Sequence, residues 1–211
     1  MTDGFAGYRT RLVEELRRQG VEDLAILRAF ATAPRHLFVP EALRSRAYED
    51  VALPVGRGQT ISQPSTQAVY LLSLQLQGHE RVLEIGTGTG YQAALLSCLA
   101  SQVFTVERIP DLATSARAAL ARARATNVTV LTGDGTLGWR PYAPYDAILV
   151  AAAGPYVPEP LVEQLSSNGR LIMPLETPTG QVLVRVTRDG SQRRVERLGP
   201  ADFVPLIGKH G

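Results

Sequence analysis

The chain has 211 residues, and its 22 basic and 20 acidic side chains give a formal net charge of +2. So small an excess of charge gives no reason to expect nucleic acid or a membrane surface as a partner. The only cysteine, Cys98, excludes an internal disulfide, and we expect its thiol to be buried. The three histidines lack the spacing of metal ligands, so no metal is expected. Without a signal peptide or a membrane span, the predicted location is the cytoplasm.

The first 80 residues predict a helical cap followed by a loop. Apolar residues at helical spacing indicate one helix that ends at Gly20 and a second that ends before Pro34. Region 52–64 is rich in glycine and proline and predicts an ordered loop. Pro64 is a suitable first residue for a third helix, which we expect to run through Leu76.

Strand and helix patterns alternate from residue 81 onward. This alternation predicts a mostly parallel, doubly wound sheet with right-handed crossovers. Alternating valines from Val182 to Val186, the turn at Asp189-Gly190 and the apolar return over 195–204 predict a C-terminal antiparallel hairpin. We therefore expect one α/β domain, with the helical cap and a substrate and cofactor loop over 1–80 and the sheet over 81–211. The expected strands are 81–85, 102–107, 127–132, 145–151 and 169–175, and the expected helices are 90–100, 110–125 and 157–167.

A glycine-rich turn follows the first of these strands. Gly86, Gly88 and Gly90 alternate with threonines, and glycine suits a turn that needs positive φ or a close approach to a ligand. Glu107 lies 21 residues after Gly86 and suits hydrogen bonds to the hydroxyls of a ribose. The spacing differs from that of dinucleotide-binding turns and P-loops, which favours a nucleoside cofactor without phosphates, S-adenosylmethionine. A ligand-free glycine turn, with Glu107 at a helix start, stays the alternative.

Further polar residues are expected at the same edge of the sheet, because ligands of doubly wound sheets bind beyond the carboxyl ends of the strands. The third strand ends in Gly133-Asp134-Gly135 and the fourth ends in 151–154. Asp134 suits a hydrogen bond from the exocyclic amine of a base, and a purely structural turn aspartate is the alternative.

Several distinctive segments are spread over nearly the whole chain. They are Pro34 to Pro40, Gly58 and Gln59, Thr60-Ile61-Ser62-Gln63-Pro64, Val82 to Ala94, Val106 to Arg108, Gly133 to Gly135 with Gly138 and Trp139, Ala143 to Ile148, and Phe203 with Val204-Pro205-Leu206. Together these segments resemble those of the protein-L-isoaspartate O-methyltransferases. The glycine-rich turn alone indicates only the wider group of S-adenosylmethionine-dependent methyltransferases, whereas Thr60 to Pro64 and Val204 to Leu206 narrow the resemblance to this family.

The resemblance implies a Rossmann-like methyltransferase fold and a site with two halves. Glu107 matches the residue that binds the cofactor ribose, and Asp134 with Gly135 matches the adenine contact. Ser62 matches the proposed catalytic serine of a loop that closes over the sulfonium, although an N-cap for the helix near Pro64 is an alternative role. Leu206 and its two predecessors are expected to contact the substrate. The implied cofactor-binding residues are Gln59, Thr60, Ile61, Ser62, Glu84, Gly86, Gly88, Thr89, Glu107, Asp134 and Gly135, and the implied substrate-binding residues are Val204, Pro205 and Leu206.

The family's reaction needs no general base. The free α-carboxylate of an isoaspartyl residue, with a pKa of roughly 3–4, is already ionised at neutral pH. We therefore expect a monomeric enzyme that methylates isoaspartyl residues of damaged proteins and starts their repair through a succinimide. A dedicated aspartyl methyltransferase acting on one precursor peptide, and a cofactor-binding module without activity, are the alternatives.

Substrate recognition is expected to rest on the peptide main chain, because many sequence contexts must be accepted. The loop Val55 to Ser62 and the segment Phe203 to Leu206 are the expected providers, and Pro205 would leave neighbouring carbonyls without a sheet partner. In the alternative interpretation, Val204 and Leu206 are simply core residues.

Overall fold

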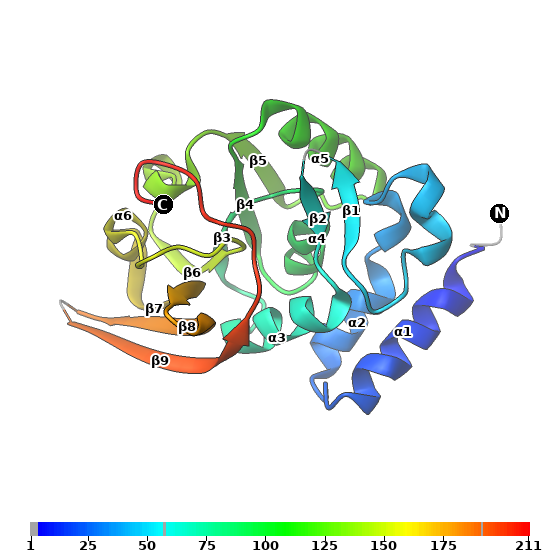
Figure 1. The fold of residues 1–211 in the computed structure, drawn as a ribbon, viewed down its shortest axis with the longest axis horizontal. Coiled ribbons are helices and arrows are strands. Elements are labelled where there is room, and N and C mark those ends of the chain that lie inside the picture. The colour runs from blue at the N-terminus through cyan, green and yellow to red at the C-terminus, as the bar shows by residue number, and fades with distance from the viewer. Residues whose placement is uncertain (1–3, 57, 191) are drawn as a thin grey trace.

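The computed structural model describes residues 4–56, 58–190 and 192–211, and a seven-stranded sheet forms its centre (Figure 1). The first five strands of the spatial order are parallel, and the last two are antiparallel to their neighbours. This arrangement confirms the predicted mostly parallel sheet with a C-terminal hairpin. In spatial order the strands are β5 (Val128–Thr132), β4 (Gln102–Glu107), β3 (Arg81–Ile85), β6 (Tyr145–Val150), β7 (Leu165–Thr177), β8 (Gly180–Asp189) and β9 (Gln192–Ala201).

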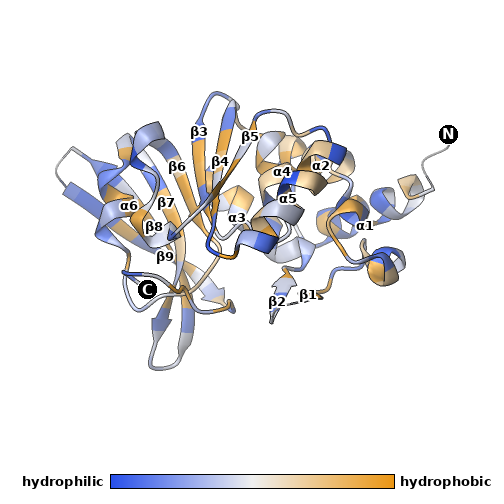
Figure 2. Ribbon diagram, turned by 90° about the horizontal axis from the view of Figure 1, so that it is seen from above, coloured by the Kyte–Doolittle hydropathy of each residue, from blue (hydrophilic) through white to orange (hydrophobic). Residues whose placement is uncertain are grey.

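The central strands are buried on both faces. Val82 and Ala147 are paired neighbours that pack into the core on one face, and Leu83 and Ile148 pack into the core on the other. Successive side chains of a strand point to opposite faces, so a strand covered on both sides is apolar at nearly every position. Figure 2 shows this distribution, with hydrophobic residues along β3, β4, β6 and β7 and a hydrophilic outer end of the β8–β9 hairpin.

Helices cover both faces of the sheet. Five helices contribute to the core on one face, whereas α6 contributes Leu161 to the other. No helix in the described part of the chain is long and apolar enough to cross a membrane. The helices are α1 (Ala6–Arg18), α2 (Leu24–Thr32), α3 (Pro64–Leu74), α4 (Tyr91–Ser97), α5 (Pro110–Arg122) and α6 (Glu159–Glu163), and the short 3-10 helices are η1 (Arg35–Leu37), η2 (Glu41–Arg46), η3 (Gly135–Leu137) and η4 (Arg140–Tyr142).

Two expectations about helices are wrong. The helix predicted over 157–167 ends at Glu163, because Leu165 already pairs with Tyr145 in the sheet. The backbone amide of Tyr145 donates a 2.8 Å hydrogen bond to the carbonyl oxygen of Gln164, which draws the chain out of the helix. The expected burial of Cys98 is also wrong: this residue is the C-cap of α4 and is exposed, because α4 ends at Ser97 and the chain turns there, with the following Leu99 and Ala100 buried instead.

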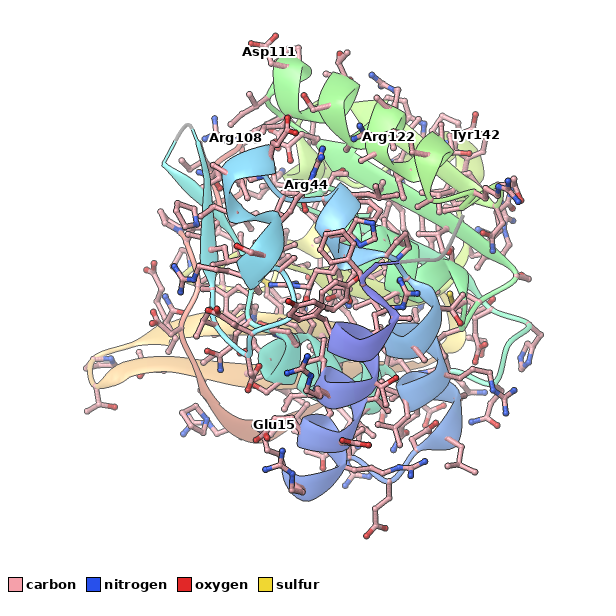
Figure 3. The ribbon with its side chains drawn as sticks, turned by 90° about the vertical axis from the view of Figure 1, so that its right-hand side faces the viewer. Glu15, Arg44, Arg108, Asp111, Arg122 and Tyr142 are labelled. Carbon is pink, nitrogen blue, oxygen red and sulfur yellow. The ribbon has the colours of Figure 1, made fainter. Side chains whose placement is uncertain are left out.

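The helical cap is tied to the sheet through α5. Arg122 at the end of α5 donates a 3.3 Å hydrogen bond to the carbonyl oxygen of Leu37 in η1 (Figure 3). Leu16 and Phe30 of the cap are fully buried and belong to the same core cluster as Leu96 of α4. The cap and the sheet therefore share one hydrophobic core.

The region predicted as a loop before α3 contains a small hairpin instead. β1 (Leu53–Gly56) and β2 (Gln59–Ile61) pair antiparallel. Gly56 and Gly58 have φ values of +90° and +67°, a region that glycine enters without steric cost. Strands of only four and three residues are too short to produce a recognisable alternation, which explains why the sequence pattern indicated a loop.

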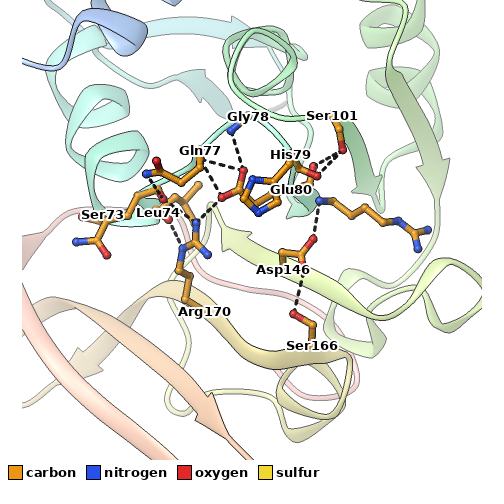
Figure 4. A network of polar contacts seen from close by, with 12 residues as sticks. Ser73, Leu74, Gln77, Gly78, His79, Glu80, Ser101, Asp146, Ser166 and Arg170 are labelled. Atoms are coloured by element: carbon orange, nitrogen blue, oxygen red, sulfur yellow. Dashed lines mark hydrogen bonds and ion pairs between the residues drawn. The ribbon is translucent and has the colours of Figure 1, made fainter.

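The amino end of the sheet is closed by a polar network around a buried carboxylate (Figure 4). Glu80 is 2% exposed and accepts hydrogen bonds from the backbone amides of Gln77 and Gly78. It also forms a 3.0 Å ion pair with Arg170. Arg170 also donates to the carbonyl oxygen of Leu74 at the end of α3. Desolvation alone would raise the pKa of Glu80, but these hydrogen bonds outweigh it and lower that pKa. The network braces the end of the sheet opposite to the carboxyl ends of the strands.

Candidate active site

A cavity of about 640 Å³ opens at the carboxyl ends of β3 and β4. Its walls come from the glycine-rich turn, the end of β4, the β1–β2 hairpin and the C-terminal segment, which comprises residues 202–211 after β9. The ends of several strands therefore converge on the cavity, as expected for a parallel sheet. Glu84 and Asp134 are the two predicted site residues that do not line it. The predicted residues that do line it are Gln59, Thr60, Ile61, Ser62, Gly86, Gly88, Thr89, Glu107, Gly135, Val204, Pro205 and Leu206.

The glycine-rich turn presents bare backbone to this cavity. Gly86 and Gly88 have φ values of +93° and +52°, and a Cβ on Gly88 would meet no atom within 4 Å. Gly90 is required for another reason, because its Cβ would lie 3.3 Å from atoms of Ala116 and Leu120 in α5. The turn therefore combines a backbone conformation that other residues rarely adopt, an open approach for a ligand and close packing against a helix.

Glu107 holds the glycine-rich turn in place and faces the cavity. Its Oε2 accepts a 2.9 Å hydrogen bond from the amide of Gly88, and its Oε1 accepts a 3.0 Å hydrogen bond from the amide of Ile109. The side chain is 5% exposed. A carboxylate has about four acceptor positions, so two remain for ligand hydroxyls. Ile109 is the N-cap of α5. The Glu107 carboxylate therefore also has the alternative role that the sequence suggested, a carboxylate at the start of a helix.

Glu84 lies beneath the site. It is fully buried in β3, and its Oε2 accepts a 2.5 Å hydrogen bond from the hydroxyl of Thr105. The Thr105 hydroxyl lies 2.6 Å from that of Thr87, which lines the cavity. Burial, with a smaller contribution from the charge of Glu107, raises the pKa of Glu84 to about 8, against a lowering by the Thr105 hydrogen bond. The carboxyl group is therefore protonated at neutral pH and reaches the cavity only through the two threonines.

Asp134 organises the C-terminal segment. Its Oδ1 accepts hydrogen bonds from the amide and hydroxyl of Thr136, and its Oδ2 accepts a 2.8 Å hydrogen bond from the amide of Lys209. Desolvation would raise the pKa of Asp134, but these hydrogen bonds lower it. Its neighbour Gly135 lines the cavity, where a Cβ would lie 2.5 Å from Cγ2 of Ile85. Asp134 therefore has the structural role in a turn that the sequence offered as an alternative to a ligand contact.

Ser62 lines the cavity with a free hydroxyl. The hydroxyl makes no hydrogen bond with any described residue, and the N-cap position of α3 belongs to Gln63. The amide of Ser65 at the start of α3 is instead satisfied by a 2.8 Å hydrogen bond to the carboxylate of Asp50. The interpretation of Ser62 as an N-cap is therefore wrong: Gln63 occupies the N-cap position, and the carboxylate of Asp50 accepts the hydrogen bond from the first turn of the helix.

Sequence reasoning missed a buried arginine behind Ser62. Arg35 is fully buried and donates 2.8 Å hydrogen bonds to the carbonyl oxygen of Ser62 and to Oε1 of Gln67. Its guanidinium carbon lies 4.8 Å from the centre of the Tyr91 ring. Desolvation by burial lowers the pKa of Arg35 to about 10, so the side chain stays charged at neutral pH. The sequence signalled Arg35 only as part of a matching segment.

Main-chain hydrogen bonds hold the predicted substrate segment, Val204 to Leu206, in place. The carbonyl oxygen of Val204 accepts a 2.8 Å hydrogen bond from the amide of Ala153, and the amide of Leu206 donates one of 2.6 Å to the carbonyl oxygen of Ala153. The expectation that the carbonyls beside Pro205 are free is therefore wrong for Val204. Leu206 is 7% exposed and belongs to the core as well as to the cavity wall.

Two further residues of the cavity wall carry polar atoms without partners. Tyr70 on α3 and Gln92 on α4 are 3% and 8% exposed, respectively. The hydroxyl of Tyr70 and Nε2 of Gln92 find no hydrogen-bond partner among the described residues. The sequence signalled Gln92 only as part of the matching segment Val82 to Ala94, and it gave no signal for Tyr70, which falls within an ordinary helical pattern.

Comparisons with known proteins agree with this geometry. The profile of the family described as protein-L-isoaspartate(D-aspartate) O-methyltransferase matches residues 8–211. A protein-L-isoaspartate O-methyltransferase of Methanoculleus marisnigri is 50% identical over 204 residues, covering 96% of this chain and 93% of the relative. One of Dictyoglomus thermophilum is 47% identical over 210 residues, covering 100% and 96%.

Solved structures give the same result. A structure titled protein-L-isoaspartate O-methyltransferase superimposes with a TM-score of 0.88 at 31% identity, over 96% of this chain and 67% of the other. A Plasmodium falciparum structure, described as a putative member in complex with S-adenosyl-L-homocysteine, gives a TM-score of 0.83 at 25% identity, over 93% and 97%. The chain therefore belongs to the protein-L-isoaspartate O-methyltransferase family.

Proposed function

We propose that this protein transfers a methyl group from S-adenosylmethionine to the free α-carboxylate of L-isoaspartyl residues in damaged proteins and peptides. Family membership supports the reaction. The main observation that supports this reaction for the present chain is that the residues of both halves of the predicted site line one and the same cavity. The glycine-rich turn and Glu107 form the cofactor half, and Ser62 with Val204 to Leu206 forms the substrate half.

The walls of the cavity fit this cofactor. Gly86 and Gly88 leave room for its methionine portion, and the unused acceptor positions of Glu107 suit the ribose hydroxyls. Gly135, where any side chain would collide with Ile85, suits the adenine end. When bound, S-adenosylmethionine supplies an electrophilic methyl group on a sulfonium.

The residues of the chain then need only bind and orient the substrate. The carboxylate is ionised at neutral pH, so no side chain has to remove a proton. Ser62 donates its free hydroxyl to one carboxylate oxygen and aims the other at the methyl group. Alignment of this kind contributes on the order of 7 kcal/mol or more to a displacement reaction. Arg35 holds the main chain of Ser62 in the position that this alignment needs.

Repair, in the cytoplasm and as a monomer, completes the proposal. The methyl ester product cyclises without the enzyme to a succinimide, which hydrolyses in part to normal aspartate. Repair of diverse damaged proteins then follows if many isoaspartyl sequences are accepted.

The decisive experiment compares an isoaspartyl peptide with its aspartyl twin in methyl transfer from S-adenosylmethionine. We expect methylation of the isoaspartyl form and little of the twin, in several unrelated sequence contexts. Equal methylation of both forms would reject repair and favour a dedicated aspartyl methyltransferase. Calorimetry with S-adenosylhomocysteine is the control, since failure to bind it would mean that the cofactor half of the proposal is wrong.

A further inference from the structure

Tyr70 carries a buried hydroxyl without a partner in the wall of the cavity. The side chain is 3% exposed, and its ring centre lies 4.9 Å from that of Phe203. Within the described ranges the hydroxyl makes no hydrogen bond. An unsatisfied buried hydroxyl destabilises a fold, so native structures keep few of them without a reason. A ligand that enters the cavity and accepts a hydrogen bond would supply that reason.

We propose that the Tyr70 hydroxyl donates a hydrogen bond to an acceptor oxygen of the isoaspartyl peptide, making Tyr70 a specificity-determining residue of the site. This inference rests on the proposed function. The acceptor is a carboxylate or main-chain carbonyl oxygen beside the methylated group, since both are present in every isoaspartyl peptide. Tyr70 would thus recognise the substrate independently of the neighbouring side chains.

The protonation state of Tyr70 suits this role. Desolvation by burial raises the pKa of its hydroxyl well above the usual range, so the group keeps its proton at any physiological pH. A protonated phenol can donate one hydrogen bond, and the Tyr70 hydroxyl has no acceptor among the described residues. Carboxylate and carbonyl oxygens of a peptide can accept the hydrogen bond that this group donates.

The position of Tyr70 favours the peptide over the cofactor. Tyr70 is on α3, the helix that follows Ser62, and it packs on Phe203 next to the predicted substrate segment. The side chain of Gln181 holds the main chain of Phe203 in place: it accepts a 2.7 Å hydrogen bond from the Phe203 amide and donates one of 2.9 Å to the Phe203 carbonyl oxygen. Among the described residues, the Tyr70 hydroxyl makes no hydrogen bond to this main chain. Apart from Gln59 to Ser62, which the resemblance also assigns to the cofactor, the cofactor half comes from other elements: the turn after β3 and Glu107 at the end of β4.

Tyr145 offers a matched control. It is also fully buried, but its hydroxyl donates a 2.7 Å hydrogen bond to the carbonyl oxygen of Trp139 and it does not line the cavity. Removing the two hydroxyls as Tyr70→Phe and Tyr145→Phe therefore separates an unused hydroxyl in the site from a used one in the core. Both substitutions keep the aromatic ring and its packing.

The test measures kcat/KM for an isoaspartyl peptide, the affinity for S-adenosylhomocysteine and the thermal midpoint of the full-length variants. For Tyr70→Phe we expect kcat/KM to fall about three- to tenfold, mainly through KM, with cofactor affinity within about twofold and an equal or higher thermal midpoint. For Tyr145→Phe we expect the reverse pattern, a lower thermal midpoint with kcat/KM within about twofold.

Three results would overturn the inference. An unchanged kcat/KM in Tyr70→Phe, with an active parent enzyme, rejects it and leaves the proposed function intact. A parallel loss of S-adenosylhomocysteine affinity assigns the hydroxyl to the cofactor instead. A parent enzyme that methylates no isoaspartyl peptide rejects the proposed function and this inference together, and the wild-type measurement identifies that case.

Discussion

The guanidinium of Arg35 donates a 2.8 Å hydrogen bond to the main-chain carbonyl of Ser62, 27 positions further along the chain. The other end of the same guanidinium binds Gln67, which also lines the cavity. No ion pair joins Arg35 to a carboxylate among the described residues. A fully buried cation is costly, so its hydrogen bonds indicate that the position of Ser62 is built into the core of the cap.

Replacing Arg35 should therefore misplace Ser62. We expect Arg35→Met to lower kcat by about 10- to 100-fold, since displacements near 1 Å cost about that much, and Arg35→Lys to recover part of the loss. Two acceptors left without a donor should also reduce the free energy of unfolding by about 2–4 kcal/mol. The double mutant with Ser62→Ala is the control: the Arg35 effect on kcat should shrink to about twofold there. Independent, multiplying effects would show that Arg35 does not act through Ser62.

Glu107 should supply much of the cofactor affinity. Two charge-assisted hydrogen bonds to ribose hydroxyls are together worth about 2–4 kcal/mol, so Glu107→Ala should weaken S-adenosylhomocysteine binding by tens-fold to several hundred-fold. The same carboxylate holds the amide of Gly88, so Glu107→Gln, which keeps one acceptor, should lose less. Isothermal calorimetry measures both. Affinities within threefold of the parent would show that Glu107 does not bind the ribose.

Ser62 should matter for turnover and hardly for stability. Because its hydroxyl has no partner among the described residues and Gln63 occupies the N-cap position, Ser62→Ala should change the free energy of unfolding by less than about 0.5 kcal/mol. We expect kcat to fall while S-adenosylhomocysteine affinity stays near that of the parent. Denaturant unfolding and steady-state kinetics on the same preparation check this. A full rate in the alanine variant would remove Ser62 from the mechanism.

Glu84 should make stability depend on pH. Its pKa is raised in the folded state, from 4.5 to about 8, so the folded protein binds a proton that the unfolded chain has lost between these values. The free energy of unfolding should therefore fall as pH rises through this window, by up to about 1.4 kcal/mol per pH unit, with no further loss above it.

Glu84→Gln isolates this effect, because the amide is neutral at every pH and still offers an oxygen to Thr105. Urea unfolding at about pH 5, 6.5 and 8 should show the parent losing stability relative to the glutamine variant as pH increases. Parallel stability curves for the two proteins would mean that Glu84 titrates normally.

Local sequence patterns were sufficient for the framework of this protein. The apolar runs of β3 and β4, the glycines between Gly86 and Gly90, and Glu107 lie within one stretch of the chain, and each depends on short-range geometry. A parallel sheet brings the ends of such strands to one edge, and the glycine-rich turn and Glu107 accordingly line one cavity. Motif spacing also indicated the family that the comparisons confirm.

Contacts between distant segments were decided only by the tertiary structure. The end of α6 depends on the hydrogen bond that the amide of Tyr145, at the start of β6, donates to the carbonyl oxygen of Gln164, and the helical period of the sequence cannot signal such a contact. Asp134 meets the amide of Lys209 across 75 positions, so its turn-like sequence context could not show that it anchors the C-terminal segment.

The same holds for the residues around the substrate half of the cavity. Arg35 reaches Ser62, and Tyr70 packs on Phe203, only because the cap, α3 and the C-terminal segment fold onto one core. A sequence pattern reports the period of burial along one element, whereas a hydrogen bond or an unsatisfied hydroxyl depends on which elements meet. The sequence by itself thus determined the family and the glycine-rich turn, and three-dimensional packing decided which polar groups make hydrogen bonds within the protein and which are left without a partner.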